Sequence, residues 1–134
     1  MRLSFSTLPV QDKSGEELLK LCQRHSMKAE IRTARDGSFP FAEGLPVTNV
    51  GTGICLLGYD EAQLEKADCQ LALIKSRGIA AARVFLGNFQ MRYDAPKRPM
   101  DEAGIVRALR HLAKSGVGIW IETHNEYATS KSLV

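Results

Sequence analysis

The chain has 134 residues, of which 44% are hydrophobic and 25% charged, and 18 basic against 15 acidic residues give a formal net charge of +3. This composition is typical of a folded globular domain and excludes a disordered or fibrous chain. The charge is small and spread along the chain, so it does not indicate a nucleic-acid partner. No apolar run approaches the roughly 18 residues that cross a bilayer. We therefore expect one domain over residues 1–134, with neither nucleic acid nor a membrane as its partner.

The three cysteines, Cys22, Cys55 and Cys69, are odd in number and far apart. Their spacing fits neither a disulfide framework nor a zinc site. We expect reduced thiols in a cytoplasmic protein.

Strand and helix patterns alternate along the chain. Strands are expected at residues 2–7, 28–33, 47–55, 80–86 and 118–122, and helices at 14–25, 60–77 and 101–114. Ser14 and Glu17 form a capping-box pattern at the first helix, and Gly78 and Gly116 follow the last residues of the other two. The stretch 34–46 contains Gly37, Pro40 and Gly44, so we expect a loop or one short turn there. Alternating strands and helices predict a parallel sheet.

Within each strand, apolar and polar side chains alternate and therefore point to opposite faces of the sheet. The polar face carries Ser4, Ser6, Glu30, Arg32, Arg83, Glu122 and His124, together with Phe85 and Trp120. A doubly wound sheet would be apolar on both faces, whereas a barrel interior accepts polar groups near the carboxyl ends of its strands. The pattern favours a partial (β/α) TIM barrel of about five parallel strands, with three to four helices on its outer face.

Charged side chains on an inner face need partners. Glu30 fits a structural ion pair with Arg32 or Arg83, and Arg83 fits an ion pair and a ligand contact equally well. Glu122 favours a functional role because His124 and Asn125 follow it directly. Carboxylate and imidazole groups suit a divalent metal such as manganese, magnesium or zinc.

The run GIWIETHN at 118–125 resembles the fifth strand of the xylose isomerase-like TIM barrels, the sugar phosphate isomerase/epimerase superfamily. Four further segments resemble the first four strands of that family, in the right order: RLSFST at 2–7, AEIR at 29–32, VTNVGTG at 47–53 and RVFLG at 83–87. The resemblance therefore extends over most of the chain.

This resemblance implies that Glu122 is both a metal ligand and a catalytic carboxylate. It implies that Arg32, Arg83, His124 and Asn125 bind a sugar or sugar phosphate at the mouth of the barrel. The implied reaction is aldose–ketose isomerisation, or epimerisation next to a carbonyl. In it, a divalent metal binds adjacent substrate oxygens and carboxylates move the proton.

A complete barrel of this type has about 250 residues, and the family's Asp, His and Glu ligands on later strands have no counterpart in this sequence. We therefore expect the N-terminal half of a barrel that is inactive by itself. Unpaired sheet edges, with Phe85 and Trp120 on the inner face, favour a homodimer or a complementing half-barrel. The alternative function is a non-catalytic half-barrel scaffold or binding module. A DNA-repair endonuclease is disfavoured because the early strands lack histidines.

Overall fold

A computed structural model describes residues 4–7, 10, 12–34, 36–57, 61–87 and 101–122. Its elements in chain order are β1 (Ser4–Ser6), α1 (Gly15–His25), β2 (Lys28–Arg32), β3 (Val47–Cys55), α2 (Glu61–Ser76), β4 (Ala81–Phe85), α4 (Glu102–Ala113) and β5 (Gly118–Glu122). Every strand and helix expected from the sequence is present, and the described ends agree to within two residues. Residues 2, 3 and 60 of the expected ranges lie outside the described residues. Within the described ranges, no helix is both long enough and apolar enough to cross a bilayer.

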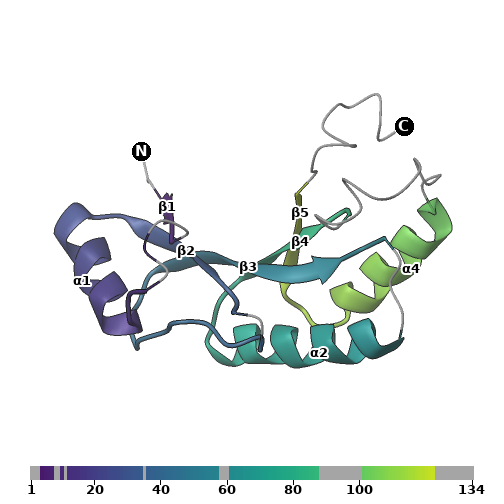
Figure 1. The fold of residues 1–134 in the computed structure, drawn as a ribbon, viewed down its shortest axis with the longest axis horizontal. Helices are drawn as coiled ribbons and strands as arrows, with labels where there is room; N and C mark the ends of the chain where they lie inside the picture. Colours follow the sequence, from purple (N-terminus) through teal and green to yellow (C-terminus); the bar gives the residue numbers. More distant parts are fainter. Residues whose placement is uncertain are drawn as a thin grey trace.

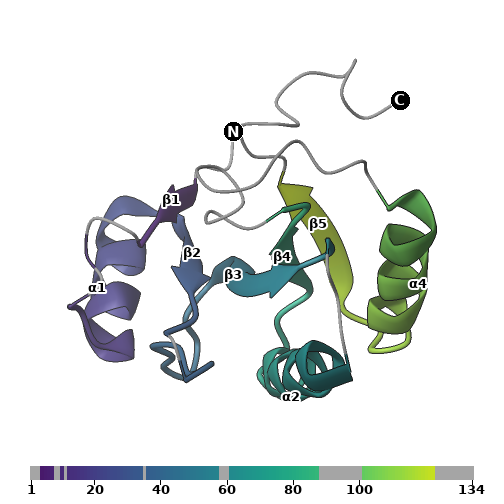
Figure 2. The same ribbon diagram turned by 45° about the vertical axis from the view of Figure 1, so that its right-hand side comes forward.

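The five strands form one sheet in the order β1-β2-β3-β4-β5, and every neighbouring pair is parallel. The helices α1, α2 and α4 lie along the convex side of this curved sheet (Figure 1). The view in Figure 2 shows the strands side by side in sequence order, with the same helices outside them. We call the two sides of the sheet the convex face and the concave face. This α/β fold agrees with the expected partial (β/α) barrel.

Local chemistry sets the helix ends. At α1 the Ser14 hydroxyl accepts from the Glu17 N–H at 3.3 Å and the Glu17 carboxylate accepts from the Ser14 N–H at 2.8 Å, so the expected capping box is present. At α4 the Asp101 carboxylate accepts from the Gly104 N–H at 2.8 Å. Gly78, just beyond α2, has a φ of +69°, which only glycine adopts without strain.

The hydrophobic core lies between the sheet and the helices. Side chains from both layers are fully buried there, namely Leu18, Ala29, Ile31, Val50, Ala67, Leu71, Ile74, Val84 and Leu112. This confirms that the alternate apolar residues of β2 and β4 face the helices. Ile121 is an exception: its register with Val84 puts it on the same convex face, but it is 47% exposed. The reason is that β5 is an edge strand of the described sheet, which α4 covers only in part.

A loop replaces the helix between β2 and β3, as expected, since the described residues of 34–46 contain no helix. Ala42 and Leu45 of this loop are buried in the core. A Cβ atom at Gly15 would lie 2.3 Å from the Phe41 carbonyl carbon, so the loop rests directly on the start of α1. The Arg77 guanidinium lies 5.2 Å from the centre of the Phe41 ring, which connects the loop to the residues after α2.

Candidate functional site

Charged and polar side chains from four strands meet on the concave face. Glu30 of β2 is in register with Asn49 of β3, and Gly51 of β3 is in register with Arg83 of β4. Arg83 is in turn in register with Trp120 of β5. Residues paired across neighbouring strands point to the same face, so the alternation in the sequence becomes a continuous row of functional groups.

Arg83 is the centre of this row. Its Nη2 lies 3.0 Å from Oε1 of Glu30, and its Nη1 forms an ion pair with Oε2 of Glu122. The Arg83 side chain is only 16% exposed. One guanidinium therefore holds two carboxylates that come from β2 and β5, and we call these three residues the carboxylate–arginine cluster. Of the two partners that the sequence left open for Glu30, the structure selects Arg83.

Gly51 allows Arg83 to reach Glu30. The two residues lie on strands β4 and β2, so the arginine side chain has to cross β3 between them. It crosses at Gly51, where a Cβ atom would lie 2.9 Å from Nη2 of Arg83 and 3.2 Å from Cγ of Arg32. A larger residue at this position would displace the Arg83 side chain, because a Cβ atom almost never comes within 3.0 Å of another group, and it would crowd Arg32 as well.

Irregular pairing of β3 adds two polar contacts to the cluster. Between Ala29 and Glu30 the register shifts, which brings the buried Asn49 beside Glu30, and Nδ2 of Asn49 donates to Oε2 of Glu30 at 3.5 Å. A second shift follows Gly51, where the Thr52 hydroxyl donates to the Arg83 carbonyl at 2.8 Å. Both contacts thus lie where the register of β3 with a neighbouring strand is irregular.

Two aromatic rings flank the cluster. The Arg83 guanidinium lies 5.7 Å from the centre of the Phe85 ring, a distance at which a cation and a ring attract each other. Trp120, next to Arg83 in register, is 51% exposed on the concave face. The site thus combines acceptors, donors and apolar ring faces, which is the usual lining of a small-molecule site.

The structure brings together three of the five residues that the sequence analysis named. Arg83 and Glu122 are in direct contact, and Arg32 lies beside Arg83 on the other side of Gly51. The other two, His124 and Asn125, lie outside the described residues. Asn49 and Trp120 were not named as site residues. Trp120 alternates with Ile119 and Ile121, and this pattern could have identified it as a site residue. Asn49 is brought to the site by the register shift at Ala29 and Glu30, which no pattern in the sequence indicates.

The described residues do not by themselves form a metal centre. Within the described ranges there is no group of three or more His, Cys, Asp or Glu side chains that could hold a metal ion. The cluster offers two carboxylates, Glu30 and Glu122, and each is already bonded to Arg83. A divalent cation at Glu122 would compete with that guanidinium for the carboxylate.

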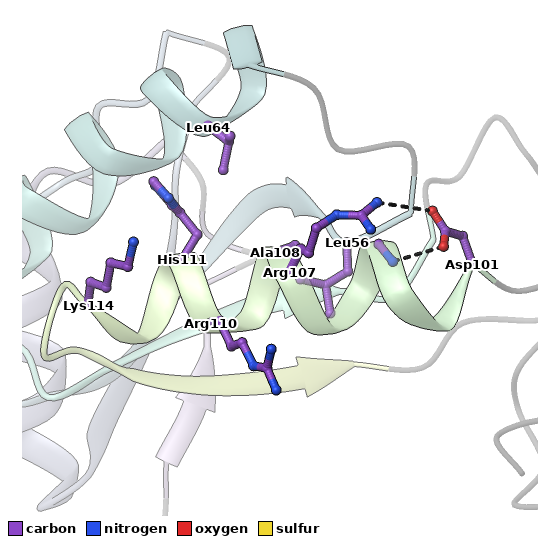
Figure 3. Close-up of a pocket in the computed structure, with 9 residues that line it drawn as sticks. Leu56, Leu64, Asp101, Arg107, Ala108, Arg110, His111 and Lys114 are labelled. Atoms are coloured by element: carbon purple, nitrogen blue, oxygen red, sulfur yellow. Dashed lines mark hydrogen bonds and ion pairs between the residues drawn. The ribbon is translucent and has the colours of Figure 1, made fainter.

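A cavity of about 440 Å³ lies between α2 and α4, on the convex side of the sheet (Figure 3). Its apolar wall is formed by Leu56, Leu64 and Ala108, and charged residues of α4 surround it. Of these, Arg107 pairs with Asp101 at 3.8 Å and His111 pairs with Asp68 of α2 at 2.9 Å. The Arg107–Asp101 pair lies at the start of α4, and the His111–Asp68 pair joins α4 to α2. Because both pairs have a role in the helix structure, we place the candidate site on the concave face.

Comparison of the chain with protein-family models, with curated proteins and with solved structures found no match. The kinship with xylose isomerase-like barrels therefore rests on the sequence motifs and stays a prediction.

Proposed function

We propose that this chain is the sugar-binding, isomerase- or epimerase-like half of a xylose isomerase-like barrel, with a sugar or sugar phosphate as its ligand. A sequential, all-parallel sheet with its helices on one face supports this architecture. The functional part of the proposal rests on the carboxylate–arginine cluster on the concave face. Three charged side chains gathered on the inner face of a sheet are costly to keep there unless they serve a ligand or one another.

The chemistry of the site matches that of a sugar. Hydroxyl groups both donate and accept hydrogen bonds, and the carboxylates accept while Arg83 and Asn49 donate. The ring of Trp120 and the ring of Phe85 offer flat apolar surfaces for the C–H face of a sugar ring. A ligand lying across the cluster would lie against groups from β2, β3, β4 and β5.

The same groups fit proton transfer next to a carbonyl. A carboxylate such as Glu122 can remove the proton as a general base, provided that it lies within hydrogen-bond reach of the carbon that loses it. The guanidinium of Arg83 can stabilise the negative charge that develops on the enediolate oxygens. In this proposal Glu122 acts on the proton and Arg83 orients both the carboxylate and the substrate.

The divalent metal of the family enters this proposal only through Glu122. Manganese, magnesium or zinc would need its other ligands from a complementing half-barrel, because the described residues hold no further cluster of ligands. The prediction that follows is weak metal binding by the chain alone and tighter binding once its complement is present.

Sugar binding can be tested directly because Trp120 is the only tryptophan in the chain. Its fluorescence should change in a saturable way when D-xylose, D-ribose or D-fructose is added. Arg83→Gln should weaken binding at least about tenfold, since hydrogen bonds to charged groups contribute about 1.5–3 kcal/mol. Arg24→Gln, at an exposed position of α1, is the matched control and should leave binding unchanged. Absence of any sugar-dependent change would contradict the proposal.

A second assay separates the catalytic function from a binding module. An isomerase or epimerase exchanges the hydrogen on the carbon next to the carbonyl with solvent, which proton NMR detects in heavy water. Exchange that is lost in Glu122→Gln and kept in Glu65→Gln, an exposed carboxylate of α2, would support catalysis. Because the chain is expected to be inactive by itself, the assay includes a complementing half-barrel. Binding without exchange in the presence of that half would favour the non-catalytic module.

The alternative function, a half-barrel scaffold that assembles with a second copy, has support of its own. Trp120 and Ile121 of β5 and Val106 of α4 are the large apolar residues exposed among those described. Two of them lie on an edge strand of the described sheet, and exposed edges favour association. Light scattering after size-exclusion chromatography should show a dimer that Ile121→Glu disrupts. A monomer that stays soluble at high concentration would reject this alternative.

A further inference from the structure

The cavity between α2 and α4 takes no part in the candidate site on the concave face. It has a volume of about 440 Å³, which is within the range of small-molecule sites. Two of the residues that line it, Leu56 of the chain after β3 and Ala108 of α4, are only 1% and 2% exposed. The cavity therefore extends from the surface to the hydrophobic core, and a ligand that enters it buries apolar surface there.

Small residues of α4 leave this space open. Gly104 and Ala108 are one helical turn apart and both line the cavity, and Leu64 points towards them from α2 (Figure 3). Gly104 cannot be replaced by a larger residue without rearrangement, because a Cβ atom there would clash with Oδ2 of Asp101. That carboxylate caps α4 by accepting from the Gly104 N–H at 2.8 Å. The helix cap thus keeps one wall of the cavity small.

Basic side chains surround the opening of the cavity. Arg107, His111 and Lys114 follow one another at spacings of four and three residues, so they share one face of the helix. Figure 3 shows His111 and Lys114 directed towards α2. Arg110 lines the cavity as well, but its side chain is directed away from α2 in the same view. Positive charge beside an apolar wall is suited to a ligand with an anionic end and an apolar body.

Lys114 is the cation that such a ligand can use. Arg107 lies 3.8 Å from Asp101, the only carboxylate among the described lining residues, and His111 pairs with Asp68 at 2.9 Å. The ion pairs within the described ranges do not include Lys114. An anion near Arg107 would also be repelled by Asp101. The negative end of a ligand is therefore expected at Lys114, and its apolar end at the inner wall.

We propose that this cavity binds a carboxylic acid with an extended apolar chain of about eight carbons. The carboxylate pairs with the ammonium group of Lys114, and the chain lies along α4 against Ala108, Leu64 and Leu56. Ala108 and Lys114 are six residues apart, about 9 Å along a helix, which an extended chain of about eight carbons spans. The inference concerns the convex side of the sheet and does not rest on the proposed function.

Calorimetric titration of the full chain tests this inference with a series of probes. Butanoate, hexanoate and octanoate vary the chain length, and octan-1-ol and octylamine replace the carboxylate by a neutral and a cationic group. Each added CH2 group should tighten binding about two- to fourfold, as expected when it is partly or wholly removed from water. Octan-1-ol should bind about threefold or more weakly than octanoate, and octylamine should not bind.

Two pairs of variants locate the ligand. Lys114→Gln should weaken octanoate binding about threefold or more and leave octan-1-ol binding unchanged, whereas Lys20→Gln, at an exposed position of α1, should have no effect. Leu64→Gln should flatten the dependence on chain length. Its matched control is Leu73→Gln, because Leu73 is also half-buried on α2 but is not among the described lining residues. Circular dichroism checks that each variant folds, and if Leu64→Gln does not, the chain-length series and Lys114→Gln decide.

Three outcomes would overturn the inference. An affinity that does not rise from butanoate to octanoate would show that no apolar chain enters the cavity. Octan-1-ol or octylamine bound as tightly as octanoate would show that the carboxylate is not recognised. Equal octanoate binding by wild type and Lys114→Gln would place the carboxylate elsewhere. None of these results bears on the sugar assays, which report on the opposite face of the sheet, so the inference and the proposed function can fail separately.

Discussion

The convex and concave faces of the sheet are built from the same strands but have opposite character. On β2, Ala29 and Ile31 point to the helices and are fully buried, whereas Glu30 and Arg32 alternate with them and point the other way. On β4, Val84 is fully buried on the convex face, and Arg83 beside it carries the ion pairs of the concave face. Consecutive residues of one strand thus contribute alternately to the hydrophobic core and to the charged concave face.

This difference indicates that stability and chemistry are separable in this fold. The convex face removes apolar surface from water, which is the main favourable contribution to folding. The concave face keeps charges close together on a partly covered surface, which contributes little to stability and suits ligand binding. Substitutions on the two faces of one strand should therefore affect different measurements.

The largest effect is expected on the convex face. Ile31→Ala should lower the free energy of unfolding by about 2–5 kcal/mol, because it removes a fully buried side chain and leaves a cavity. Arg32→Ala, one residue further along β2, should cost less than about 1 kcal/mol, since that side chain is only partly buried. Urea unfolding followed by circular dichroism measures both. Similar losses from the two variants would show that the faces do not differ as argued.

A smaller loss of stability should follow from Arg83→Met on the concave face. It leaves Glu30 and Glu122 without their shared counter-charge, at a cost of about 1–3 kcal/mol because all three side chains keep some contact with solvent. The double variant Arg83→Met/Glu122→Gln should recover part of the loss, since it also removes one of the two carboxylates that lose Arg83 as a counter-charge. If the double variant is less stable than the single one, the ion pairs are not the cause.

Most of the fold could be predicted from the sequence because its determinants are local. Ser14 and Glu17 mark the start of α1, Gly78 follows the end of α2, and the alternation around Ile31 identifies the buried face of β2. The exposure of Ile121 could not be predicted, since it depends on the position of β5 at the edge of the described sheet and not on its own strand pattern.

The site could be predicted only in part because its contacts depend on register. The sequence placed Glu30, Arg32 and Arg83 on one face but left the partner of Glu30 open. Arg83 is the partner because its side chain crosses β3 at Gly51. That crossing depends on the strand order and on the register shifts of β3, which only the structure gives. Asn49 was not predicted for the same reason: its position beside Glu30 follows from a register shift.

Two glycines of β3 offer a sharper comparison within the concave face. A Cβ atom at Gly51 would press on Arg83 and Arg32, whereas a Cβ atom at Gly53 would have no neighbour within 4 Å. Gly51→Ala should therefore lower the free energy of unfolding by about 1–2 kcal/mol and weaken sugar binding. Gly53→Ala should change stability by no more than about 0.5 kcal/mol and leave binding unchanged. Equal effects would show that Gly51 is not the crossing point of Arg83.

The three cysteines allow the two faces to be compared without any substitution in the chain. Cys22 is buried in the convex core, Cys55 is half-buried next to Phe85 in register, and Cys69 is exposed on α2. Burial raises the pKa of the Cys22 and Cys55 thiols above the ordinary 9.0. Since the thiolate is the reactive form, iodoacetamide at about pH 8 should modify Cys69 first and Cys22 last. Peptide mass spectrometry measures the order, and early modification of Cys22 would contradict the packing of α1 on the sheet.

The raised pKa of Cys22 also predicts a weak dependence of stability on pH. The thiol ionises less readily in the folded chain than in the unfolded chain, so its contribution is fully present below pH 9.0 and declines as the pH rises above that value. Cys22→Ala should be less stable at neutral pH because it leaves a small cavity in the core. Its free energy of unfolding should nevertheless fall less steeply above pH 9.0 than that of the wild type. Identical slopes would mean that Cys22 is in contact with water, and the convex face would then be less completely closed than its buried side chains indicate.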